Sequence, residues 1–283
     1  MVSPQARRGQ VAWLCHGGLS QRRACGLLGI ARSGMSYLLR QPAKDAPVIE
    51  AMHRLSSQYP RYGYRRVRIF LAREGMTMSP GRAERLWRKA QLQVPQKRPR
   101  KRAASRSRPL PPMAANHVWA YDFVFDACAN GQSLKCLTVV DEFTHESLAI
   151  DVAGSIRSAR VIDVLAKLIS WHGAPAFLRS DNGPEFVSNA ILKWLTDNRI
   201  DTAYIDPGKP WQNGTAESFN GKFRDECLSV EWFRTRAEAK VVIEAWRHHY
   251  NAVRPHMSLN YLTPHEFKSQ HLPRVINPAI SQQ

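Results

Sequence analysis

Apolar residues recur with two different periods along this chain of 283 residues, and the change of period divides it into two parts. Before about residue 95 the apolar positions repeat every three or four residues, which is typical of helices that bury one face. After residue 115 short apolar runs of strand character alternate with helical segments. The sequence therefore predicts an all-helical first part and a mixed α/β second part.

The first helical unit, residues 1–46, is predicted to hold two short helices separated by a tight break. Ser20 is placed to cap the first helix, and the second runs over residues 31–40. This spacing is typical of a helix-turn-helix, whose second helix enters the major groove of DNA. Arg32 and Tyr37 on that helix are therefore predicted to contact DNA, although any small helical hairpin has similar spacing.

A second helical unit, residues 47–94, follows a break that contains proline, residues 41–47. Its first two helices are joined by a segment in which arginine and tyrosine are interleaved. Such residues suit phosphate contact and base stacking, so Arg61, Arg65 and Arg66 are predicted to bind DNA. The tyrosines between them fit a helix core equally well.

Residues 95–115 are predicted to form an extended linker. The stretch 95–112 contains seven Lys or Arg, five Pro and no acid, a composition that cannot bury a core. Its cations are predicted to follow a nucleic-acid backbone, and those singled out are Lys97, Arg98, Arg100, Lys101 and Arg102.

The α/β part, residues 116–230, is predicted to be a mixed sheet covered by helices, because three consecutive strands precede alternating helices and strands. The expected elements, in order, are strands 117–125, 134–141 and 146–153, helix 158–171, strand 176–180, helix 188–199 and a short strand at 202–205. Ligands of such sheets gather at the strand ends and the adjoining loops. A helical tail is expected over residues 231–283.

Charge is distributed as unevenly as the apolar pattern. The formal charge is +18 and the pI about 10.2, and residues 1–112 hold 24 Lys and Arg against 4 Asp and Glu. The remaining residues hold 17 against 19. The basic part is therefore expected to bind a polyanion, with double-stranded DNA favoured over an anionic membrane.

Several other classes of protein are disfavoured. No apolar run approaches the roughly 20 residues of a membrane helix, and the N-terminus lacks a signal-peptide pattern, so a cytoplasmic protein that does not enter membranes is expected. The five cysteines include no C-x-x-C pair, which argues against a zinc ribbon or a disulfide framework. His248, His249 and His256 are expected to be surface or packing residues.

Three acidic residues in the α/β part are candidates for a metal site. Asp122 interrupts an apolar strand, Asp181 stands at a strand tip before Asn-Gly-Pro, and Glu217 opens a helix 36 positions later. A lone buried carboxylate is costly unless a cation or hydrogen bonds compensate it. Hard oxygen ligands favour Mg²⁺ or Mn²⁺, and two such ions would serve phosphodiester cleavage. Arg224, about two turns beyond Glu217, is placed to hold a substrate phosphate.

Ordered motifs along the chain resemble those of a known protein family. Asp122, Asp181 and Glu217, with 35 residues between the last two, resemble the D-D-35-E triad of DDE transposases and retroviral integrases. The chain as a whole resembles the OrfB-type transposases of the bacterial insertion-sequence-three family. The motifs that carry this resemblance are Tyr62-Gly63-Tyr64-Arg65-Arg66, Trp119-Ala120-Tyr121-Asp122-Phe123, Val140-Asp141-Glu142-Phe143, Ser180-Asp181-Asn182-Gly183-Pro184-Glu185-Phe186, Glu217-Ser218-Phe219-Asn220-Gly221, Tyr250-Asn251, Arg254-Pro255-His256 and Leu262-Thr263-Pro264.

The resemblance implies a ribonuclease-H-like fold for the sheet. It implies a metal-dependent DNA transposase that cleaves 3′ ends and transfers strands at the ends of an insertion sequence, with the three acids as ligands of the ions. It further implies a bacterial, nucleoid-associated protein that acts as a homo-oligomer, with an upstream-frame protein or a frameshift fusion as a partner. Met257 and Asn260 depart from the family pattern near the C-terminus and leave the triad untouched.

Two other functions stay open on the sequence alone. A nuclease of the same fold would cut DNA without joining strands, and a non-catalytic partial product would occupy the element's ends and repress transposition. The intact acids argue against the second function, because binding DNA gives no reason to place carboxylates near phosphate. Asp126, Asp141 and Glu185 are extra acids near the site and are interpreted as residues that support the fold or the ligands.

Overall fold

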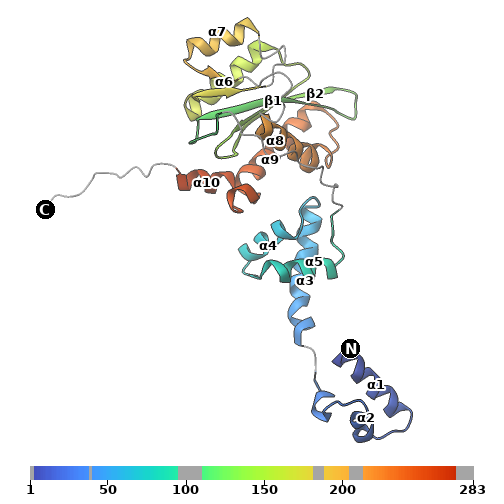
Figure 1. The fold of residues 1–283 in the computed structure, drawn as a ribbon. Coiled ribbons are helices and arrows are strands. Elements are labelled where there is room, and N and C mark those ends of the chain that lie inside the picture. The colour runs from blue at the N-terminus through green and yellow to red at the C-terminus, as the bar shows by residue number, and fades with distance from the viewer. Residues whose placement is uncertain (1–2, 38–39, 95–109, 181–187, 204–212, 272–283) are drawn as a thin grey trace, which may run out of the picture. The chain divides into compact units, whose positions relative to one another are not determined.

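The computed structural model describes residues 3–37, 40–94, 110–180, 188–203 and 213–271 (Figure 1). The chain divides into two compact units, of which the first comprises Met1–Pro60 and Phe70–Gln93 and the second Arg61–Ile69 and Val94–Gln283. Within the described ranges, no helix combines the length and the apolar composition that crossing a bilayer requires.

The N-terminal part of the first unit is a pair of helices, α1 (Pro4–His16) and α2 (Gln21–Leu27). Each begins at a serine, Ser3 and Ser20, whose hydroxyl accepts the backbone N–H three residues later. The N-cap predicted at Ser20 is confirmed. A small apolar core lies between the two helices and contains Val11, Ala24 and Cys25.

The second helix predicted over residues 31–40 is wrong. Its described residues up to 37 form only η1 (Arg32–Gly34), a single 3-10 turn. Glycine and serine are poor helix formers, and Ser36 donates its hydroxyl to the Ser33 carbonyl at 3.1 Å, which offers the backbone a local alternative to helical bonding. The helical pair of this region is therefore α1 with α2.

Three further helices follow: α3 (Arg40–Gln58), α4 (Tyr64–Arg73) and α5 (Pro80–Lys89). Ser79 caps α5, as the Ser-Pro pair at its start predicts. The first residues of α4 belong to the second unit and the last ones to the first. Helices α3 and α5 pack together in the first unit, and their buried residues include Met52, Leu55, Leu86 and Trp87.

The break predicted at residues 41–47 is wrong, because α3 continues through them. Pro42 falls in the first turn of the helix, where its missing N–H needs no partner. Asp45 is buried and accepts a hydrogen bond from Arg82 of α5 at 2.8 Å. This ion pair joins the first part of α3 to α5.

The second unit is built on a five-stranded mixed sheet of order β3-β2-β1-β4-β5. The strands are β1 (Val118–Ala127), β2 (Ser133–Asp141), β3 (Ser147–Ala153), β4 (Phe177–Arg179) and β5 (Asp201–Thr202). The central strand β1 pairs antiparallel with β2 and parallel with β4. The mixed α/β sheet predicted from the sequence is confirmed.

Helices cover both faces of this sheet (Figure 1). One face carries α6 (Ser158–His172) and α7 (Asn189–Asp197), and the other carries α8 (Gly214–Phe223) and α9 (Arg236–Ala252). Along β1, Trp119 and Tyr121 enter the first core and Val124 enters the second, because successive side chains of a strand point to opposite faces. The strand is thus held by apolar packing on both sides.

Shorter helical segments follow α8 and α9. Directly after α8 it makes a short π-helix, η3 (Arg224–Leu228), a rare conformation that often accompanies functional sites. After α9 follow η4 (Met257–Leu259) and α10 (Pro264–His271). The tail predicted to be helical is therefore helical over much of its described part.

Two adjacent buried acids fix the loops at one end of the sheet. Asp141 accepts hydrogen bonds from the backbone N–H groups of Asn116 and Thr144, both at 2.7 Å. Burial raises the pKa of Asp141, and these hydrogen bonds oppose the rise. Glu142 forms an ion pair with Arg179, the last residue of β4, at 3.3 Å, and both side chains are 2% exposed or less. Asp141 thus supports the fold, as the sequence indicated.

Replacing Glu142 by glutamine is expected to destabilise the second unit by about 3–5 kcal/mol, because the buried Arg179 guanidinium loses its carboxylate. The change is measured as the free energy of unfolding in urea. Glu244, which pairs with Arg247 at 2.6 Å with its side chain 48% exposed, provides a matched control. Glu244→Gln should cost no more than about 1 kcal/mol. Equal effects of the two substitutions would show that the Glu142 pair does not anchor β4.

Candidate active site

The first candidate acid, Asp122, lies in the middle of the central strand β1, and its side chain is half-buried. Its Oδ1 accepts a hydrogen bond from the backbone N–H of Phe123 at 2.7 Å, and its Oδ2 accepts one from the Asn220 amide at 2.8 Å. Both donors are neutral, so they orient the carboxylate without cancelling its charge.

Asn220 connects Asp122 to helix α8 and to the neighbouring strand β2. Its amide oxygen lies 3.0 Å from the Thr138 hydroxyl, which also lies 3.1 Å from the Asp122 backbone carbonyl. Thr138 is 1% exposed and Asn220 7% exposed. Because the ionised carboxylate can only accept, Asn220 turns its N–H toward Asp122 and its amide oxygen toward the Thr138 hydroxyl. No role was predicted for Asn220; the signal that could have found it is its position three residues after Glu217 on one helix.

The second described acid, Glu217, lies in the first turn of α8, and its side chain is exposed. Asn220 follows three residues later, so the two residues lie about 4.5 Å apart along the axis on neighbouring positions of the helix surface. The bond from Asn220 to Asp122 sets α8 against the face of the sheet from which Asp122 projects, and Glu217 lies on the exposed side of that helix. The opposite side of the helix is buried through Ala216, Phe219 and Phe223.

Asp181, the middle acid of the predicted site, lies outside the described residues. The strand before it, β4, ends at Arg179, whose guanidinium donates to the Leu110 carbonyl at 2.9 Å and pairs with Glu142. In the parallel ladder Arg179 pairs with Ala120 of β1. The described structure therefore fixes the chain two residues before Asp181, and the role of this acid stays a prediction.

The available donors suit a hard metal ion. Asp122 and Glu217 offer carboxylate oxygens, the ligands that Mg²⁺ and Mn²⁺ prefer. Among the residues that the structure describes, no three His, Cys, Asp or Glu side chains are grouped to hold a metal. Cys136 and Cys227 lie in the apolar core under α8, and burial raises the pKa of each thiol to about 12. These thiols stay protonated, which is unsuited to zinc.

Arg224 opens the π-helix η3, and its side chain is exposed. Its guanidinium donates to the Phe125 carbonyl of β1 at 3.4 Å. It therefore reaches the same strand that bears Asp122. Its predicted contact with a substrate phosphate stays a prediction.

Two other predicted DNA-contact arginines lie against η3. Arg61 donates to the Asp225 carbonyl at 3.2 Å, and Arg66 pairs with Glu226 at 3.3 Å. Tyr62, between them in sequence, is buried. This segment therefore makes contacts inside the second unit, and the contact of its arginines with DNA stays a prediction.

The remaining predicted DNA contacts are exposed or lie outside the described residues. Arg65 is exposed, with its guanidinium 5.6 Å from the Tyr64 ring centre. Arg32 is exposed in η1, and Tyr37 is 54% exposed with the Arg8 guanidinium 5.1 Å from its ring centre. The linker cations outside the described residues are Lys97, Arg98, Arg100, Lys101 and Arg102.

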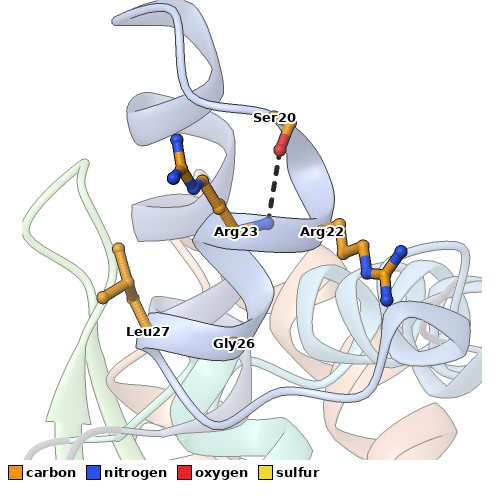
Figure 2. Close-up of a pocket in the computed structure, with 5 residues that line it drawn as sticks. All are labelled: Ser20, Arg22, Arg23, Gly26 and Leu27. Carbon is orange, nitrogen blue, oxygen red and sulfur yellow. Dashed lines mark hydrogen bonds between the residues drawn. The ribbon is translucent and has the colours of Figure 1, made fainter.

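A surface hollow of about 720 Å³ lies on α2 in the first unit. Figure 2 shows Arg22 and Arg23 extending to opposite sides of the helix, with Leu27 one turn below Arg23. The remaining lining residues are Ser20 and Gly26. None of the predicted acids lines this hollow, so it is a basic surface of the helical part and not a portion of the candidate active site.

Known protein families and relatives match this chain over most of its length. Two integrase core domain families match residues 112–210 and 198–264, and an HTH-like domain matches residues 42–100. The insertion element IS407 uncharacterized 31.7 kDa protein of Burkholderia multivorans is 42% identical, over 94% of this chain and 96% of its own. The insertion element IS476 uncharacterized 39.2 kDa protein of Xanthomonas euvesicatoria is 40% identical, over 99% of this chain and 81% of its own.

More distant similarities extend to a transposase and to a viral enzyme. The transposase InsD of insertion element IS2 from Escherichia coli is 27% identical, over 80% of this chain and 79% of its own. Among solved structures, the catalytic core domain of HTLV-2 integrase in complex with magnesium is similar with a TM-score of 0.44 and 18% identity, over 56% of this chain and 99% of that domain.

Asn220 and Thr138 are expected to be coupled energetically, because they share one hydrogen-bond network with Asp122. Asn220→Ala, Thr138→Val and the double substitution form a double-mutant cycle, and an interaction energy of roughly 0.5–3 kcal/mol is expected from unfolding in urea. Asn198 donates to the Trp194 carbonyl at an exposed helix end and provides the control. The cycle of Asn198→Ala with Thr138→Val should be additive within about 0.5 kcal/mol. Additivity in both cycles would contradict the network.

Proposed function

Because the chain belongs to the insertion-sequence-three family of OrfB-type transposases, within the DDE transposase and retroviral integrase superfamily, we propose that it cleaves and joins DNA at the ends of an insertion sequence. Its sheet is the ribonuclease-H-like core of that superfamily, and an HTH-like domain precedes it. The proposed reaction frees a 3′ end by metal-dependent cleavage and then transfers that end to target DNA.

The hydrogen bond from Asn220 to Asp122 is the observation that supports this proposal best. It joins the helix that bears Glu217 to the strand that bears Asp122. The helix that carries one proposed acid is thereby tied to the strand that carries another, which an isolated DNA-binding surface would not require. Under the proposal, the two carboxylates converge to hold cations against a phosphate.

The register of the sheet supports a position for the third acid, Asp181, beside Asp122. Ala120 and Arg179 are partners in the parallel ladder of β1 and β4. Asp122 follows the first of these residues by two positions, and Asp181 follows the second by two positions. Strands that continued in this register would set the two aspartates side by side.

Under this proposal Asp122, Asp181 and Glu217 hold Mg²⁺ or Mn²⁺, as two ions. When bound, such ions lower the pKa of a coordinated water and stabilise charge on the attacked phosphate and on the leaving oxygen. The chain would supply the oxygen ligands, and the Phe123 N–H and the Asn220 amide orient the Asp122 carboxylate by hydrogen bonds.

The chemistry would proceed in two displacements at phosphorus. In the first, a water oxygen bonds to phosphorus as the bond to the 3′ oxygen breaks, which leaves a 3′-OH and a 5′-phosphate. In the second, this 3′-OH attacks a phosphodiester of the target and displaces another 3′ oxygen. Since one phosphodiester replaces another, joining needs no ATP. Arg224 would hold a neighbouring phosphate so that the reacting groups stay aligned.

Double-stranded DNA is the proposed partner, bound at the element's ends and at the target. The HTH-like match over residues 42–100 and the excess of cations in residues 1–112 support this assignment. Bringing two ends together would take more than one copy of the chain, so a homo-oligomer is proposed. An upstream-frame protein, or a fusion with it, is a further proposed partner.

Asp122→Asn and Glu217→Gln are each expected to lower Mg²⁺-dependent nicking of a duplex with the element's own end by roughly 100-fold or more, since each removes an ionised ligand. Asp181→Asn should act in the same way. Affinity for the duplex should be nearly unchanged, as measured by fluorescence anisotropy. Glu231→Gln alters an exposed acid of the same unit and is expected to keep full nicking. Nicking at the wild-type rate by Glu217→Gln would contradict the assignment of that acid.

Strand joining distinguishes a transposase from the two alternatives. A duplex with a free 3′-OH at the element's end and a supercoiled target are mixed with the protein and Mg²⁺, and joined products are expected. Cutting without joining would identify a nuclease. Binding without cutting would identify a non-catalytic DNA-binding protein, and either outcome would contradict the proposal.

A further inference from the structure

Two arginines pair with one carboxylate beside the helix of Glu217, and a lysine precedes that carboxylate by four residues. They are Arg66 of α4, Lys222 of α8 and Arg254 after α9, and the carboxylate is Glu226 of η3; we call these four residues the α8 cationic cluster. All of them belong to the second unit. The cluster therefore has a formal charge of about +2, which is high for side chains that are partly or fully buried.

Glu226 is engaged chiefly by Arg254. The two side chains form a bidentate pair with N–O distances of 2.6 and 2.5 Å, and they are 7% and 1% exposed. Burial is the largest single influence and would lower the pKa of Arg254, but the hydrogen bonds and the charge attraction to Glu226, with smaller contributions from Tyr62 and Tyr250, together raise it. Paired bonds between guanidinium and carboxylate are strong, so the charge of Glu226 is largely matched by Arg254.

Arg66 and Lys222 are the outer members of the cluster. Arg66 contacts Glu226 at 3.3 Å, and its side chain is 27% exposed. Lys222 donates to the Ser218 hydroxyl at 3.1 Å, a neutral partner, and is half-buried. An anion from solvent can therefore reach both cations without entering the core.

The charged forms of both outer cations are disfavoured in the protein without DNA. Burial, followed by repulsion from Arg254, lowers the pKa of Arg66 and lowers that of Lys222 to about 8, while Glu226 opposes both effects. His256 also faces Lys222, and burial lowers its pKa to about 2, so it is neutral and adds no charge. Within the described ranges, Glu226 is the one acid among the charges that act on Lys222.

We propose that Lys222 and Arg66 form a binding site for a phosphodiester of the DNA backbone, next to the catalytic helix. The site rests on the proposed function, which supplies DNA as the ligand. A phosphate there would halve the excess charge of the cluster and accept hydrogen bonds from an ammonium and a guanidinium. Lys222 follows Glu217 by five residues, about 7.5 Å along the helix axis and about 140° around it, so this contact would be separate from the proposed cleavage site.

The dependence of binding on salt tests this site directly. Affinity for a duplex with the element's own end is measured by fluorescence anisotropy over a series of NaCl concentrations. Lys222→Gln should reduce the slope of log affinity against log salt by about 1, because one phosphate contact is lost. Lys240→Gln, which alters an exposed lysine of α9, should leave the slope unchanged. A wild-type slope for Lys222→Gln would overturn the site.

The dependence of binding on pH separates a phosphate contact from a structural role of Lys222. Bound phosphate favours the protonated lysine, so wild-type affinity should fall on the order of tenfold between about pH 7 and 9.5, as the free protein loses this proton. Lys222→Arg stays charged and should show little of this loss. The comparison stands even where Lys222→Gln fails to fold. Equal pH dependence of the wild type and Lys222→Arg would overturn the site.

These measurements do not depend on catalysis. If the wild type nicks DNA normally and Lys222→Gln keeps the wild-type salt slope, the phosphate site alone is overturned. If the wild type does not nick DNA but the salt slope changes as expected, the proposed catalysis is overturned and the site is supported as a DNA contact.

Discussion

The hydrogen bond from Asn220 to Asp122 is the contact on which the arrangement of the functional residues depends. Each of its two ends belongs to an element that is already rigid. Strand β1 is central in the sheet and has an apolar core on each face, and α8 is anchored in one of these cores by Phe219 and Phe223. The orientation of the Asp122 carboxylate therefore follows from packing, and a single amide transmits the position of the helix to the strand.

The described acids of the second unit fall into two groups with different uses. Asp141, Glu142 and Glu226 are buried side chains that hold a turn, the end of β4 and the π-helix in place through hydrogen bonds or ion pairs. Asp122 accepts hydrogen bonds from the Phe123 N–H and the Asn220 amide, and Glu217 faces solvent. The first group stabilises the fold, while the second is the group that the proposed metal chemistry would use.

The local sequence pattern predicted those features that depend on a single helix or strand. Strand β1, helix α6 and the buried side of α8 each follow from a repeat of apolar positions, and Asp122 stood out as an acid within an apolar run. Contacts between distant residues gave no local signal: Arg66 and Glu226 are 160 positions apart, and Asp45 and Arg82 are 37 apart. The sequence around Arg66 does not show that this residue pairs with Glu226. The prolines at the start of α3 likewise predict a break, because the sequence does not show the ion pair that Asp45 makes with Arg82.

The π-helix Arg224–Leu228 limits how this part of the chain can vary among related proteins. A π turn contains an extra residue, and that residue rotates everything after it by about 100° relative to a regular α-helix. Before the turn, Asn220 must face Asp122; within it, Glu226 must face Arg254. Both conditions are set by the number of residues between them. Substitutions at the other positions of the turn can therefore be tolerated in evolution, whereas the loss or gain of one residue between Asn220 and Glu226 would satisfy one contact at the expense of the other.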